Sequence, residues 1–323
     1  MKGNNRTLWI VALLCAVVAM AATTGVGQNV TSVLEIEPGV AGLGMAGAVS
    51  SRTGHVESLF YNPAGLASLE GFSLTSFYSS QWGESNYSAF GAAISGWSLG
   101  YMMFSSGDIQ GRDDSGSPTE TLRYRNSAAL LAFGLGENLL PFLGSLPVDL
   151  SIGGRVKFVS TSFGETEGSG VSIDLATQIG FNPIRAGGFS ISDLRIGVVM
   201  LDLFGRVNYD GYTESFGMDL RAGFSAELFD ALVIGFEFGP LGTIHLGVEY
   251  SVIEILAIRA GMLSLSDVFT FTVGLGFDLQ GFGIDYALET HTDLSATHRV
   301  ALSIDFGRLN MSSLSGILRS ILP

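Results

Sequence analysis

The chain has 323 residues, and its 16 Lys and Arg against 30 Asp and Glu give a formal net charge of −14 at pH 7. Such an acidic chain is poorly suited to bind nucleic acid, so we predict no nucleic-acid partner. Only 14% of the residues are charged, and the mean hydropathy of +0.40 is high for a water-soluble protein.

The first 21 residues have the pattern of an export signal. Lys2 and Arg6 precede an uncharged apolar stretch, which Ala19-Met20-Ala21 closes. We therefore predict a secretory signal peptide over residues 1–21, in preference to a retained membrane helix. Its removal takes away Cys15, the only cysteine, and changes the net charge to −16. The mature chain then has neither disulfides nor thiolate metal sites.

Residues 22–70 show no strand-like alternation and predict a compact hatch or plug. Four glycines between 39 and 47 are followed by the turn-rich sequence 61–65. Pro63 fixes its own φ and pushes Asn62 toward extended geometry, while Gly65 permits a positive φ, so we expect a stiff turn. This turn either braces a plug or shapes a gate. The sequence 42–47 matches the dinucleotide-binding fingerprint, but it lacks the βαβ context that the motif needs, so no nucleotide is expected.

Residues 71–306 alternate between polar and apolar side chains, most clearly at 243–250. Such a period of two is typical of β-strands. Alternating segments are expected at roughly 71–80, 86–95, 96–106, 122–134, 148–160, 170–181, 192–203, 215–228, 231–239, 242–251, 254–263, 267–279, 281–290 and 297–306. The fold class is therefore all-β, with about fourteen antiparallel strands.

The apolar face of these segments carries large side chains, and after the signal no uncharged apolar run is long enough for a spanning helix. A closed barrel is the simplest spanning alternative, because every backbone polar group inside lipid must be paired internally. We predict a transmembrane β-barrel in the outer membrane of a diderm bacterium, with lipid outside and a polar, glycine-rich lumen. Aromatic residues at predicted strand ends are expected to form an interfacial girdle: Trp82, Tyr87, Trp97, Tyr101 and Phe104.

The last predicted strand has an apolar stripe of Val300, Leu302, Ile304 and Phe306. This stripe suits recognition by the barrel-assembly machinery, although any last strand of a sheet would share it. Residues 307–323 are expected to form a C-terminal tail, in which 309–322 are weakly amphipathic and are expected either to lie at the periplasmic interface or to plug the opening.

No spacing predicts a catalytic or metal site. His245 and Glu249 are two pleats apart and would need a third ligand, and no nucleophilic triad is apparent. We predict that the chain is not an enzyme and has no cofactor. Mixed charges on the inward face indicate mutual ion pairing that holds the barrel and the hatch together, in preference to an ion-selective pore.

Several motifs resemble those of the FadL/TodX superfamily of outer-membrane transporters, and more closely its PorV/PorQ-like branch. They are Gly44-Met45-Ala46-Gly47-Ala48, Tyr61-Asn62-Pro63-Ala64-Gly65-Leu66-Ala67, Gly247-Val248-Glu249-Tyr250, Arg259-Ala260-Gly261, Asp285-Tyr286-Ala287 and His298-Arg299. The resemblance implies a fourteen-stranded barrel whose N-terminal hatch folds into the lumen.

The resemblance also implies passive uptake of hydrophobic small molecules such as fatty acids or hydrocarbons. The alternative that it implies is an accessory barrel of a secretion system, which binds secreted proteins. A transporter predicts an apolar pocket between hatch and wall, whereas an accessory predicts a sealed lumen and an apolar patch on the outer loops. The expected hatch or gate residues are Asn62, Pro63, Ala64, Gly65 and Leu66, and the expected lumen contacts are Arg155, Glu249, Arg259 and Asp285.

Overall fold

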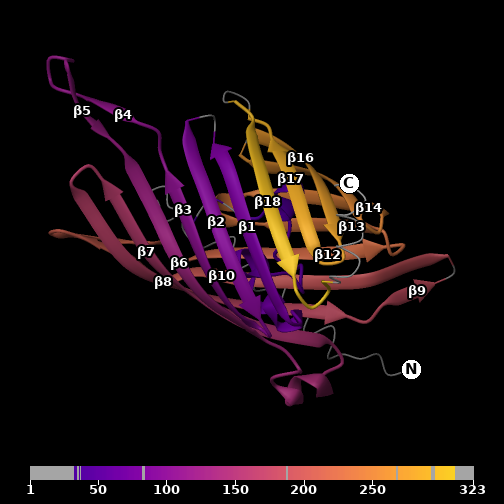
Figure 1. Ribbon diagram of the computed structural model, residues 1–323. Helices are drawn as coiled ribbons and strands as arrows, with labels where there is room; N and C mark the ends of the chain where they lie inside the picture. The colour runs from indigo at the N-terminus through magenta and orange to yellow at the C-terminus, as the bar shows by residue number, and fades with distance from the viewer. Residues whose placement is uncertain are drawn as a thin grey trace.

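The computed structural model describes residues 33–34, 36, 38–81, 84–186, 188–266, 268–291 and 295–309 (Figure 1). The predicted signal peptide, Trp82 and most of the predicted C-terminal tail lie outside these residues. Among the described residues, no helix is long and apolar enough to span a bilayer.

Fourteen strands of the described chain close into an antiparallel barrel. They are β1 (Phe72–Gln81), β2 (Ser85–Ile94), β3 (Trp97–Ser105), β6 (Tyr124–Leu135), β7 (Asp149–Phe163), β8 (Thr166–Phe181), β10 (Phe189–Tyr209), β12 (Asp219–Leu228), β13 (Leu232–Phe238), β14 (Ile244–Ile253), β15 (Leu256–Leu265), β16 (Val268–Leu279), β17 (Phe282–Glu289) and β18 (Thr297–Asp305). The last strand pairs with the first, from Ser73 opposite Asp305 to Ser80 opposite His298. The predicted all-β barrel of about fourteen strands is confirmed.

Short elements decorate the two ends of the barrel. We call the end where β1 begins and β18 stops the termini end, and the opposite end the far end. At the termini end lie η2 (Pro141–Ser145) and β9 (Ile184–Ala186). At the far end lie β11 (Tyr212–Ser215), η3 (Pro240–Gly242) and a separate hairpin of β4 (Ile109–Arg112) and β5 (Pro118–Leu122). Figure 1 shows this hairpin projecting beyond the rim.

The outer face of the barrel is apolar along strand after strand. On β14, Ile244, Leu246 and Val248 are each about two-fifths exposed, whereas the alternating His245 and Glu249 are buried. The same alternation runs along β16. An exterior of this kind is stable against hydrocarbon, because every ladder group is paired within the closed sheet.

The predicted aromatic girdle is only partly correct. Trp97 and Tyr101 point outward and are about half exposed. Tyr87 instead faces the lumen, fully buried, and its hydroxyl donates to the carbonyl of Ile36 at 2.8 Å. Phe104 also packs against the inner core. The strand period puts both residues on the inner face, and this outweighs the general preference of aromatics for the interface.

Three short helical segments of the chain before β1 occupy the lumen: α2 (Val40–Gly44), α3 (Ser58–Tyr61) and η1 (Pro63–Ser68). We call the described residues between 33 and 70 the hatch. Its large buried side chains, such as Met45, Leu59 and Leu66, pack in one core with small wall residues such as Ala93 and Ala132. The core of the molecule therefore lies between hatch and wall, because lipid takes the place of solvent outside.

Candidate functional site

The turn at Asn62 fixes the middle of the hatch. Asn62 is extended, with φ −143° and ψ 100°, and its Oδ1 accepts a hydrogen bond from the Ala64 amide at 3.0 Å. Its amide nitrogen donates to the carbonyl of Ser50 at 2.5 Å, within the hatch, and to the carbonyl of Thr177 on β8 at 3.4 Å. Asn62 is fully buried. This side chain therefore joins two parts of the hatch and the wall.

Gly65 serves a different purpose from the one expected, since it is not among the residues with positive φ. A Cβ at this position would lie 2.7 Å from the carbonyl oxygen of Arg52 and 2.8 Å from Oγ of Ser58. The position needs glycine because two hatch segments pass too close for any side chain. Pro63, Ala64 and Leu66 of the same turn are all buried.

Glycines on the inner wall let the hatch backbone lie directly against the sheet. A Cβ on the wall would come within 2.6 Å of a hatch backbone atom at Gly134, Gly153, Gly197, Gly235, Gly247 and Gly261. Gly153 is the tightest of those facing the Asn62 turn, at 2.4 Å from the Ala64 nitrogen. Bare backbone on both sides makes the fit close, and any larger residue would push the hatch away.

Arg155 on β7 contacts the hatch directly. Its Nη1 donates to the carbonyls of Leu59 and Phe60, at 2.8 and 2.5 Å, and its Nε donates to Asp174 on β8 at 2.6 Å. Lys157 bonds Asp174 at 2.7 Å as well. Arg155, Lys157 and Asp174 are all at least 94% buried. The paired charges therefore form a network that is shielded from water.

The same network reaches a distorted stretch of wall. Strand β10 loses register against β8 between Met200 and Leu203 and again between Leu203 and Arg206, with Asp202 at φ 59° and Phe204 at φ 56°. These are two β-bulges, which bend a strand and interrupt its ladder. The Asp202 amide donates to Asp174 at 2.9 Å, and its carboxylate accepts from Lys157 at 2.7 Å. One carboxylate, Asp174, thus serves both a bulge in the wall and the arginine that contacts the hatch.

A hollow of about 490 Å³ lies in the wall beside these bulges. Its lining comes from β7, β8 and β10: Phe158, Val159, Ser169, Gly170, Val171, Ser172, Ile173, Leu203, Phe204, Arg206 and Asn208. Phe204 is 82% exposed. The hollow is mostly apolar toward the outside, so it offers a surface for a hydrophobic molecule.

The other three expected lumen contacts meet on the opposite wall. Glu249 on β14 binds Arg52 of the hatch through two hydrogen bonds of 3.1 and 3.2 Å. Arg259 on β15 binds Glu249 at 2.5 Å and Asp285 on β17 at 2.5 Å. The carbon chain of Arg259 also lies against Gly44 of α2. The structure brings Glu249, Arg259 and Asp285 into one row, whereas Arg155 belongs to the separate network described above.

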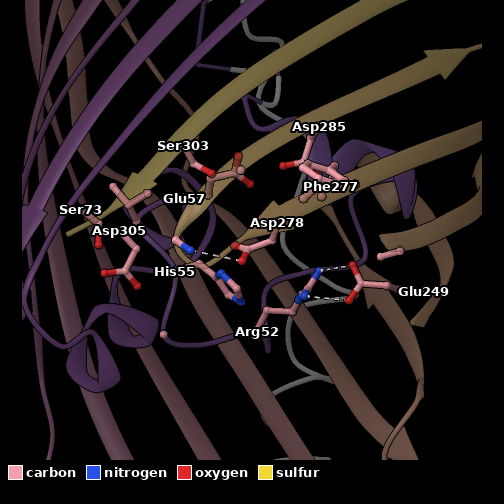
Figure 2. A pocket seen from close by; sticks show the side chains of 18 of the residues that line it. Arg52, His55, Glu57, Ser73, Glu249, Phe277, Asp278, Asp285, Ser303 and Asp305 are labelled. Carbon is pink, nitrogen blue, oxygen red and sulfur yellow. Dashed lines mark hydrogen bonds and ion pairs between the residues drawn. The ribbon is translucent and has the colours of Figure 1, made fainter. Parts of the chain in front are cut away.

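A second cavity, of about 430 Å³, lies between the hatch and the wall at the termini end, and we call it the chamber. Figure 2 shows Arg52, His55 and Glu57 of the hatch facing Asp278 and Asp305 of the wall across it. Charged and hydroxyl side chains contribute much of this lining. The chamber is therefore not the apolar pocket that a transporter was expected to have at this place.

Two hatch groups in the chamber titrate away from their ordinary values. The side chain of His55 is exposed to the cavity but lies inside the barrel, where desolvation by the surrounding protein, helped by nearby Arg52, lowers its pKa to about 4. Desolvation and the charge of Asp285 raise the pKa of Glu57 to about 7. Near pH 7, His55 is therefore uncharged and Glu57 is close to half-ionised.

Several contacts of the hatch were not expected as site residues. The Val49 and Ser50 amides donate to Glu237, at 3.2 and 2.8 Å, and His245 Nδ1 lies 2.6 Å from the carbonyl oxygen of Ala46. Glu237 and His245 were identifiable as inward-facing charged or polar residues. Arg52 gave no signal, because the hatch has no periodicity from which to infer the direction of its side chain.

No group of three His, Cys, Asp or Glu among the described residues could hold a metal ion.

The chain forms a transmembrane β-barrel with an internal hatch, because its sheet is closed, its exterior is apolar and the hatch fills its lumen. No protein-family model matches the chain, and no curated protein matches it. Among solved structures it is similar to the toluene transporter TbuX of Ralstonia pickettii, with 13% identity and a TM-score of 0.53, over 84% of this chain and 99% of that one. A Pseudomonas aeruginosa FadL homologue aligns at 11% identity and a TM-score of 0.47, over 83% and 98%. The likeness to TbuX establishes a common fold, and the PorV/PorQ-like branch stays a prediction.

Proposed function

We propose that this protein lies in the outer membrane and lets hydrophobic small molecules cross it passively. The observation that carries the proposal is the hollow at the bulges of β10, beside the network through which Arg155 contacts the hatch. The fold shared with the toluene transporter TbuX supports the same class of cargo. The predicted signal peptide supports export.

In this proposal a ligand enters at the far end and shifts the hatch. Loss of the bonds from Arg155 to the carbonyls of Leu59 and Phe60 then changes the position of Asp174, which also holds the Asp202 amide in the bulge. The ladder between β8 and β10 is interrupted twice and is therefore a weak part of the wall, because bulged residues lack regular partners. The ligand leaves sideways there, into the apolar phase of the membrane.

Uptake of a labelled aromatic hydrocarbon by cells tests this proposal. A deletion strain should take up the compound several-fold more slowly than the same strain carrying the gene. Val171→Trp, which fills the hollow, should leave uptake near the level of the deletion strain. Val248→Trp is the matched control, since Val248 is equally exposed on the outer face of β14 but lies outside the hollow. Equal uptake with and without the gene would refute the proposal.

A second candidate is the binding of a secreted protein at the cell surface, as an accessory of a secretion system. The projecting hairpin of β4 and β5 favours it, together with Tyr212 and Met218, which are 63% and 45% exposed at the same end. Replacing residues 109–122 with a short glycine turn separates the two candidates. Uptake would be kept if the protein is a transporter, and protein export or surface retention would be lost if it is an accessory.

A further inference from the structure

The charges that line the chamber do not balance. Among the residues that the structure describes, six carboxylates face it, namely Glu57, Glu249, Glu254, Asp278, Asp285 and Asp305, against three arginines, namely Arg52, Arg259 and Arg308. His55 adds no positive charge near pH 7, since its pKa is about 4. The chamber therefore carries a net negative charge.

Each of these arginines is already bound to a wall carboxylate. Arg52 binds Glu249, Arg259 binds Glu249 and Asp285, and Arg308 binds Asp278 at 2.9 Å. An incoming anion would have to displace one of these carboxylates before it could bind a guanidinium. The chamber thus offers an anion no cation that is already available.

The surplus carboxylates are Glu57, Glu254 and Asp305, which form no ion pair among the described residues. Asp305 accepts a hydrogen bond from the Gly307 amide at 2.9 Å, and Glu254 is exposed at the turn between β14 and β15. Asp305 faces the chamber near Ser73 and Ser303 (Figure 2). Burial raises the pKa of Glu57, and the neighbouring Asp285 adds to the rise because it opposes a further negative charge.

We propose that the chamber discriminates among solutes by charge, so that it admits uncharged and cationic compounds and disfavours carboxylates. The inference concerns the chamber itself and goes beyond the proposed function, because the chamber lies at the termini end and not at the lateral exit beside β10. The charges of Glu254 and Asp305, within about 8 Å of a solute at the dielectric constant of a partly hydrated site, change its local concentration by roughly tenfold per unit charge at low salt. A hydrocarbon or an amine would then enter the chamber, and a fatty-acid anion of the same size would be held out of it.

Thiol chemistry tests the chamber without requiring transport. The predicted mature chain has no cysteine, so Ser303→Cys places a single thiol at the chamber wall. The purified full mature protein in detergent is reacted at 10 mM salt with cationic trimethylammonioethyl, anionic sulfonatoethyl and uncharged methyl methanethiosulfonates. Ser145→Cys, exposed at the same end but outside the chamber, is the matched control, and the unsubstituted protein gives the background.

The ratio of cationic to anionic rate constants should be at least about tenfold higher for Ser303→Cys than for Ser145→Cys. Adding Glu254→Gln and Asp305→Asn should return it to within about twofold of the control. Equal ratios at the two positions, a faster anionic reaction, or a thiol that reacts with none of the three reagents would overturn the proposal. If the thiol ratios are as expected but the gene has no effect on uptake, the transport function is refuted and this inference stands. If the gene speeds uptake but the two thiol ratios are equal, this inference is refuted and the transport function stands.

Discussion

Asp174 is fully buried, and two cations, Arg155 and Lys157, balance its charge. Buried ion pairs add little stability over apolar contacts, but removal of one partner leaves an uncompensated charge. The network therefore matters less for how strongly it stabilises the barrel than for what it connects. It links the carbonyls of the hatch to a bulge in the wall, 45 residues further along the chain than Lys157.

Arg155→Ala should lower the free energy of unfolding by about 3 to 5 kcal/mol, because Asp174 loses a charged partner in a buried site. Arg123→Ala is the control, since Arg123 and Asp108 form an ion pair in which both side chains are more than half exposed, and its loss should cost less than about 1 kcal/mol. Denaturant unfolding in detergent or lipid measures both. Equal losses for the two variants would show that the Arg155 network is not a buried charge cluster.

The chamber predicts a pH dependence with opposite signs for its two hatch groups. Glu57 has a pKa of about 7 in the folded protein against 4.5 ordinarily, so its contribution to stability is complete below pH 4.5 and is lost as the pH rises through 7. His55 has a pKa of about 4 against 6.5, so its contribution is present above pH 6.5 and is lost as the pH falls through 4.

Glu57→Gln should therefore stabilise the protein at pH 8, by about 1 to 2 kcal/mol once partial contact with solvent is allowed for, and change little at pH 4.5. Unfolding curves at both pH values measure the difference. Glu254→Gln, at the exposed mouth of the same chamber, is the control and should show no such pH-dependent gain. A Glu57→Gln variant that is less stable at pH 8 than at pH 4.5, relative to the unsubstituted protein, would contradict this account.

At the scale of elements, the hatch and the barrel wall fit because each supplies what the other lacks. The wall contributes glycine and alanine on its inner face, and the hatch contributes large apolar side chains and unpaired backbone groups. Glu237, His245 and Arg155 then satisfy hatch amides and carbonyls that no regular sheet or helix pairs. These contacts pair backbone groups of a hatch whose helices are short, and so lower the cost of burying it.

Gly153→Ala tests this fit, since the added Cβ would lie 2.4 Å from the Ala64 nitrogen. The hatch must move, at a cost of about 1 to 3 kcal/mol, while the barrel itself should still form. Limited proteolysis should cut the hatch faster, and the heat-induced shift of the barrel on a denaturing gel should remain. Gly188→Ala is the control, because nothing lies within 4 Å of that position. Equal protection of the hatch in both variants would contradict the close packing.

At the scale of the whole molecule, the sequence predicts the barrel well because one physical rule, alternation across a sheet, acts on nearly every strand. Strand number and the inward direction of Arg155, Glu249 and Arg259 follow from it. The rule cannot locate the two bulges of β10, because an extra residue leaves no mark on an already apolar run. Strands β7, β8 and β10 also extend beyond the predicted segments, where polar and small residues hide the continuation of the ladder.

The packing of the hatch was beyond prediction for a related reason. Aperiodic segments such as 33–70 carry turn signals but no indication of which wall they touch, so Arg52 and the polar chamber could not be foreseen. The purpose of Gly65 was inferred from backbone freedom, although it depends on a close approach of two segments that only the folded chain defines.

In the proposed transport, hydrophobic molecules pass only when the hatch moves relative to the wall, and a reversible tether between the two tests this movement. Ala67 of η1 and Gly136, just after β6, would place two Cβ atoms 3.3 Å apart with no other atom within 4 Å, close to the spacing in disulfides. Uptake of a labelled aromatic hydrocarbon is measured in cells that carry the Ala67→Cys/Gly136→Cys protein, first after oxidation to form the disulfide and then after its reduction. Cells that carry either single variant are treated in the same way as controls. We predict that oxidation lowers uptake to the level of the deletion strain and that reduction restores it in the double variant alone. Uptake that is equally fast with the disulfide formed would contradict a moving hatch.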